Sequence, residues 1–86
     1  MRKFQAVEQG VITKACQAAG YCFAEREDGE TVFLHEYQRR LPLADGRWIP
    51  QDSLTFPEEG DRVEFVAEVE SQTNRLRATQ WVVVQH

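Results

Sequence analysis

Large and small side chains alternate in two short runs, residues 20–26 and 31–37. The Asp28-Gly29 dipeptide between them is typical of a β-hairpin turn. Because successive side chains on a strand point to opposite faces, the aromatic positions of both runs share one face and the aliphatic positions share the other. We expect an aliphatic face that meets the core (Cys22, Ala24, Val32, Leu34) and an aromatic face at the surface (Tyr21, Phe23, Phe33, His35, Tyr37).

Three further runs have the period-two pattern of strands. Residues 4–16 predict a long first strand, in which Gly10 supplies a bend or bulge, although residues 14–19 could instead form a helical turn. Residues 62–70 predict a strand with one face in the core (Val63, Phe65, Ala67, Val69) and the other in water. A polar turn at residues 71–74 leads to a last strand over residues 75–85, in which Trp81 could plug the end of a barrel.

The segment from residue 38 to residue 60 contains all three prolines and is long for a loop without structure. Three alternatives stay open for it: a functional loop, a small hairpin about Asp45-Gly46, or a helical turn near residues 51–54. Trp48 in this segment either serves a site or pins the loop to the rest of the protein.

Five strands without a convincing long helix predict an all-β fold, a small five-stranded antiparallel barrel or a sandwich. The 86 residues are enough for one domain, residues 1–86. A closed barrel would also cover the edges of the valine-rich last strand.

Composition narrows the function classes. No apolar run is long enough to span a bilayer, and no apolar segment follows the basic Met1-Arg2-Lys3, so we expect no membrane segment, no signal peptide and a cytoplasmic protein. Cys16 and Cys22 lack the partners of a zinc site, and packed thiols are favoured over a disulfide between them. The net charge of −4 argues against a polyanion binder held by bulk electrostatics.

The order of these features resembles a cold-shock domain, a five-stranded oligonucleotide-binding (OB) barrel. Residues 19–24, Ala-Gly-Tyr-Cys-Phe-Ala, resemble the family's first nucleic-acid motif, Lys-Gly-Phe-Gly-Phe-Ile. Residues 32–36, Val-Phe-Leu-His-Glu, resemble its second motif, Val-Phe-Val-His-Phe, and residues 59–65 are similar to its Glu-Gly-x-x-Val-x-Phe. The likeness spans residues 10 to about 81, nearly the whole chain.

The chain departs from the family pattern where the family binds nucleic acid. Ala19 replaces the lysine that opens the first motif, and Glu36 replaces the aromatic residue after the motif histidine. Lys14 and Ala15 stand where the family has tryptophan and phenylalanine in the first strand. Each change removes stacking surface or positive charge.

The resemblance implies binding of single-stranded RNA or DNA by base stacking on exposed aromatic side chains, with low sequence specificity, as in an RNA chaperone or regulator. The implied platform is Tyr21, Phe23, Phe33 and His35, extended by Tyr37, with Trp48 closing over it from the long segment. Candidate phosphate contacts are Lys14, Arg39, Arg40, Arg47, Arg75 and Arg77.

Two other function classes remain beside this one. Aromatic surface suits a protein partner or a homodimer equally well, so a protein-interaction barrel that has lost nucleic-acid binding is the alternative. An enzyme is not expected, because no paired carboxylates, phosphate-binding glycine loop or metal-ligand cluster is visible, and no cofactor or metal is expected. Judged singly, aromatic residues at period two are more often core than platform, and an Arg39-Arg40 pair is more often solvated.

Overall fold

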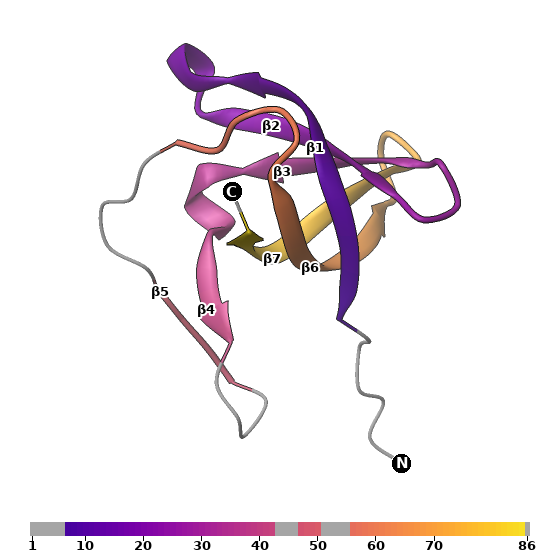
Figure 1. Ribbon diagram of the computed structural model, residues 1–86. Helices are drawn as coiled ribbons and strands as arrows, with labels where there is room; N and C mark the ends of the chain where they lie inside the picture. Colours follow the sequence, from indigo (N-terminus) through magenta and orange to yellow (C-terminus); the bar gives the residue numbers. More distant parts are fainter. Residues whose placement is uncertain (1–6, 43–46, 51–55, 86) are drawn as a thin grey trace.

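The computed structural model describes residues 7–42, 47–50 and 56–85, and these form a closed five-stranded barrel with a separate two-stranded sheet (Figure 1). The barrel strands are β1 (Glu8–Cys16), β2 (Tyr21–Arg26), β3 (Thr31–His35), β6 (Arg62–Glu70) and β7 (Arg75–Gln85). Two 3-10 turns follow β1 and β3: η1 (Gln17–Ala19) and η2 (Glu36–Gln38). The prediction of an all-β, OB-like barrel with a long connection after its third strand is confirmed.

The strands follow the order β1-β2-β3-β7-β6 around the barrel, and β6 returns to β1. Four of the pairings are antiparallel, as expected, but β3 and β7 run parallel, with Phe33 opposite Arg77. A closed ring with an odd number of strands cannot alternate direction throughout, so one neighbouring pair must be parallel. The barrel is therefore mixed, and the parallel pair closes it.

The core lies inside the barrel and draws on all five strands. Trp81 and Phe65 are its largest fully buried side chains. Aliphatic and small side chains fill the rest: Ile12, Cys22, Ala24, Val32, Leu34, Val63 and Ala78. Burial of these apolar side chains is the main favourable contribution to folding.

The two long C-terminal strands begin and end where the pattern predicts. The buried and exposed side chains, however, do not alternate regularly along them. Val63 and Phe65 are buried as expected, whereas Val66 is also buried and Val69 is 59% exposed. Strand β7 contains a register shift, because Val66 pairs with Gln80 and Ala67 with Ala78, which leaves Thr79 as an extra residue and puts Ala78 and Trp81, three residues apart, both in the core. The predicted alternation of β6 is wrong at Val66 and Val69, whereas Ala67 packs against the core as expected.

Strand β1 also differs from expectation in the position of its bulge. Ile12 pairs with Ala24 and Lys14 with Phe23, so the extra residue is Thr13 and not Gly10. Gly10 instead lies where β1 is paired to both β2 and β6. The predicted helical turn is limited to η1, and residues 4–6 of the predicted strand lie outside the described residues.

The long connection contains its own small sheet. β4 (Arg40–Pro42) and β5 (Trp48–Pro50) pair antiparallel, which agrees with the hairpin alternative, whereas residues 43–46 and 51–55, including the predicted helical turn, lie outside the described residues. Figure 1 shows this sheet extending away from the barrel end at which η2 lies. A bridge between Arg39 and Trp81 attaches it to β7.

Gly10 gives a direct test of the barrel's packing. A β-carbon at Gly10 would lie 2.7 Å from the Glu25 carbonyl oxygen and 3.1 Å from the Phe65 ring. We therefore expect Gly10→Ala to lower the free energy of unfolding by about 1–3 kcal/mol, measured by urea denaturation. Val69→Ala, at an exposed strand position, is the control and should lower it by less. An unchanged stability of Gly10→Ala would contradict the close approach of β1 and β2.

Candidate nucleic-acid interface

The hairpin of β2 and β3 divides its side chains between core and surface as the sequence pattern predicts. The aliphatic positions Cys22, Ala24, Val32 and Leu34 are all fully buried. The ring-bearing residues alternate with them, and four of these are half-buried: Tyr21, Phe23, Phe33 and His35. Cross-strand pairing sets Tyr21 opposite His35 and Phe23 opposite Phe33, so these rings lie on one outer face. This face is called the aromatic platform below, with Tyr37 included.

The rings of the aromatic platform form one continuous surface. The Phe23 and Phe33 centroids are 5.7 Å apart, and the Tyr21 ring lies 5.5 Å from Phe23 and 5.4 Å from Phe33. The His35 ring is 6.1 Å from Phe33 and 4.8 Å from Tyr37, whose residue is 78% exposed. Such edge-to-face and tilted contacts stabilise the rings against one another while leaving part of each ring accessible.

Two basic residues flank this platform in the same register. Lys14 pairs with Phe23, Phe23 with Phe33, and Phe33 with Arg77. Paired residues on neighbouring strands point to the same face, so a cation stands at each end of a row of two rings. With neighbouring strands about 4.8 Å apart, the backbones of Lys14 and Arg77 are separated by about 14 Å. We call these four residues the central row.

The bulge at Thr13 is what puts Lys14 on this face. Without the extra residue, Lys14 would stand opposite the buried Cys22 and point into the core. With it, Ala15 takes that place, and Cys16 stands opposite Tyr21. The Thr13 hydroxyl donates a hydrogen bond of 3.4 Å to the Phe23 carbonyl oxygen across the bulge.

The outer end of the platform is held by backbone contacts to buried groups. The indole nitrogen of Trp81 donates a 2.8 Å hydrogen bond to the His35 carbonyl oxygen. The Tyr37 backbone N–H donates to Nδ1 of His35 at 3.2 Å, so η2 begins with its first turn capped by the imidazole. The Glu36 N–H donates to the carbonyl oxygen of Gly20, whose φ of 76° suits glycine. These contacts fix the backbone of the segment that carries His35 and Tyr37, whose rings continue the surface of the Phe33 ring.

A hollow of about 700 Å³ adjoins the platform on the side of β7. The rings of Tyr21, Phe23 and Phe33 line one part of it, and residues of the β6–β7 end line the other. Its charged side chains are Glu30, Glu70, Arg75 and Arg77. Nη1 of Arg77 lies 3.3 Å from a carboxylate oxygen of Glu70. The hollow therefore combines stacking surface with both signs of charge.

The other predicted phosphate contacts lie apart from the central row. The Arg39 guanidinium packs over the buried Trp81 ring, 5.4 Å from its centroid, and burial lowers the pKa of Arg39. Arg40 and Arg47 belong to the extension around β4 and β5. Trp48 is half-buried on β5, and none of the ring contacts among the described residues joins it to the platform. The structure thus brings together Lys14, Tyr21, Phe23, Phe33, His35, Tyr37, Arg75 and Arg77.

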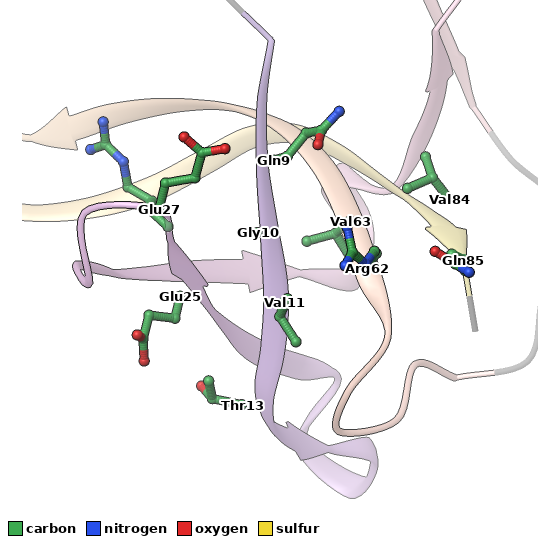
Figure 2. Close-up of a pocket in the computed structure, with 11 residues that line it drawn as sticks. Gln9, Gly10, Val11, Thr13, Glu25, Glu27, Arg62, Val63, Val84 and Gln85 are labelled. Carbon is green, nitrogen blue, oxygen red and sulfur yellow. The ribbon is translucent and has the colours of Figure 1, made fainter.

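A second hollow, of about 850 Å³, is lined by residues of β1 and β6, the end of β2 and the end of β7 (Figure 2). Figure 2 shows Glu25 and Glu27 on one side of β1 and Val84 and Gln85 on the other, with Arg62 beside them. Its lining mixes opposite charges with neutral polar groups and lacks the aromatic rings of the first hollow. We assign it no ligand.

The two cysteines are free thiols with different surroundings. Cys22 lies in the core, and burial raises the pKa of its thiol to about 12. Cys16 lies at the edge of the platform, where a hydrogen bond with its thiol raises the pKa of the Tyr21 hydroxyl above its usual value. Tyr21 therefore stays neutral at physiological pH.

Comparison with known proteins adds no assignment. No protein-family model matches the chain, and no curated protein matches it.

Within the described residues, no three His, Cys, Asp or Glu side chains are grouped to hold a metal ion. That same part of the chain contains no helix of the length and apolar character needed to cross a bilayer.

Thiol labelling tests the two faces of β2 directly. At pH 8 we expect a disulfide reagent to modify Cys16 rapidly in the folded protein and Cys22 only after unfolding, because the reactive thiolate of Cys22 is suppressed by burial. The measurement is the number of protein thiols that react with the reagent before and after denaturant is added. Cys16→Ser should remove the fast phase, and Cys22→Ser should leave it. A fast phase that follows Cys22 would overturn the assignment of faces.

Proposed function

We propose that this protein binds single-stranded nucleic acid by stacking successive bases on the aromatic platform. The observation that carries the proposal is the central row, in which Lys14 and Arg77 flank the rings of Phe23 and Phe33. Every base has a π-face, so stacking on these rings tolerates any sequence. A cation at either end of the row can contact the phosphates that accompany the stacked bases.

We further propose that the chain is a divergent cold-shock-like protein. The order of its motifs supports this, and so does an OB-like barrel with both aromatic motifs on one outer face. Tyr37 offers ring surface next to His35, beside the position at which Glu36 lacks it. Lys14 offers positive charge beside Phe23, although Ala19 lacks the lysine of the first motif. The proposed ligand is thus the family's, with a different arrangement of contacts.

Affinity should come mainly from stacking. The net charge is −4, and Glu30 and Glu70 line the hollow beside the rings. Bulk attraction to phosphates is therefore small, and we expect weak binding with broad sequence tolerance, suited to holding RNA or DNA unpaired.

Removing one ring from the centre of the row tests stacking. Phe33→Ala should weaken binding of a fluorescent oligo-thymidine or oligo-uridine about 5- to 150-fold, the equivalent of about 1–3 kcal/mol for one stacked base. Anisotropy titration gives the affinity, and thermal unfolding checks that the fold is kept, since Phe33 is only half-buried. Phe56→Ala is the matched control, because Phe56 lines a separate hollow with Pro57 and Glu58. Wild-type affinity in both Phe33→Ala and Phe23→Ala would exclude the platform as the binding surface.

Charge at the β1 end of the row gives a second test. Lys14→Gln should weaken binding and make the dependence of log affinity on log salt concentration shallower by about 0.7, the contribution of one phosphate contact to a single strand. Titrations at several salt concentrations measure this slope. Arg62→Gln removes a charge beside the second hollow and should leave the slope unchanged. Equal slopes for Lys14→Gln and the wild type would remove Lys14 from the interface.

A protein partner is the second candidate function. The observation that favours it is the 78% exposure of Tyr37 at the end of a continuous aromatic surface, next to Glu36. Aromatic residues are enriched in protein interfaces, and the acidic balance of the chain suits a basic partner. The oligonucleotide titration separates the two candidates, because a protein-interaction barrel would bind no oligonucleotide even at low salt.

A further inference from the structure

Glu70 pairs with Arg77 in the hollow beside the aromatic platform. Its carboxylate oxygen Oε2 lies 3.3 Å from Nη1 of Arg77, and both side chains line the hollow beside the rings of Tyr21, Phe23 and Phe33. Arg77 is also the residue that stands opposite Phe33 at the end of the central row. The basic end of the platform on β7 thus already holds an anionic group.

A phosphate can replace the Glu70 carboxylate as the partner of Arg77. The Arg77 side chain is 40% exposed and that of Glu70 36%, and ion pairs with this much solvent contribute little to stability. A phosphate offers a guanidinium the same charge-assisted hydrogen bonds that a carboxylate offers. A bound phosphate and the Glu70 carboxylate therefore compete for the same donors, and the two anions also repel each other.

We propose that Glu70 is an internal competitor for phosphate at Arg77 and sets the affinity and the salt dependence of the platform. This inference rests on the proposed function. With Glu70 in contact, the resting platform offers stacking surface and the Lys14 end of the row, and a nucleic-acid backbone gains Arg77 only by displacing the carboxylate. The net result is weaker binding, and faster release, than the rings and the two cations would give without Glu70.

Glu30 provides a matched comparison in the same hollow. It lines the hollow with Glu70 and carries the same charge, but its carboxylate lies 3.5 Å from Arg26 at the hairpin turn. Arg26 also contacts Glu8 at 2.7 Å and is not part of the central row. Loss of the Glu30 charge therefore makes the electrostatic potential in the hollow less negative but leaves the ion pair between Arg77 and Glu70 in place.

The test compares Glu70→Gln with Glu30→Gln in titrations of a labelled oligo-thymidine at several salt concentrations. We expect Glu70→Gln to bind about fivefold more tightly than the wild type and its salt slope to be steeper by about 0.7, because one more phosphate contact forms freely. Glu30→Gln should gain less than about twofold and keep the wild-type slope. A structural effect of Glu70→Gln on the turn would alter stability but would not steepen the slope.

A double-mutant cycle with Arg77→Gln then isolates the pair. In the Arg77→Gln background, Glu70→Gln should lose most of its gain, since there is no guanidinium left to release. Wild-type binding with no gain in Glu70→Gln, an equal gain in Glu30→Gln, or an undiminished gain without Arg77 would each overturn the inference and leave the proposed function standing. If Glu70→Gln binds the oligonucleotide and the wild type does not, both the inference and the proposed function are supported. If neither the wild type nor any variant binds, both are overturned.

Discussion

The structure depends on the burial of four apolar side chains on one face of the β2–β3 hairpin. Cys22, Ala24, Val32 and Leu34 are completely enclosed by the barrel. Because strand side chains alternate, enclosing this face puts the neighbouring rings outside, whatever those rings then bind. The aromatic platform is thus the reverse side of the core. Substitutions that enlarge or shrink the core face would move the rings as well, since both faces share one backbone.

Much of this arrangement was predictable from the sequence. The hairpin and its turn at Asp28-Gly29 follow from period-two patterning, and so do the bounds of β6 and β7. The pattern divides the hairpin into an aliphatic and an aromatic face, but exposure of the aromatic face was favoured mainly by the family resemblance, because aromatic residues at this period are more often core. The positions of the bulges were not predicted: Gly10 was the expected site on the first strand, but the extra residues are Thr13 and Thr79. Thr13 and Thr79 both donate a hydroxyl hydrogen bond to a carbonyl oxygen of the neighbouring strand, but this signal has meaning only once the partner strand is known.

The charged residues were also predictable only in part. Sequence reasoning selected Lys14 and Arg77, which flank the rings, and also Arg39, which packs on Trp81. Whether an arginine faces the platform or the core depends on strand pairing across distant parts of the chain. The contact between Arg77 and Glu70 spans the β6–β7 turn, so a scan of the sequence for basic residues finds the arginine and misses the carboxylate that pairs with it.

The parallel pair of β3 and β7 has a consequence for how folding and binding are related. It is the pairing that closes the barrel, and within the described residues it has one registered position, Phe33 opposite Arg77. The seam of the barrel therefore lies at the β7 end of the central row, between Phe33 and Arg77. Under the proposed function, a nucleic-acid strand that stacks on Phe33 and contacts Arg77 would cross this seam and stabilise the closed barrel in proportion to its occupancy. Opening of the seam would in turn separate Arg77 from the other three residues of the row while the pairing of β1 with β2 stays intact, so that loss of the proposed phosphate contact would accompany loosening of the barrel.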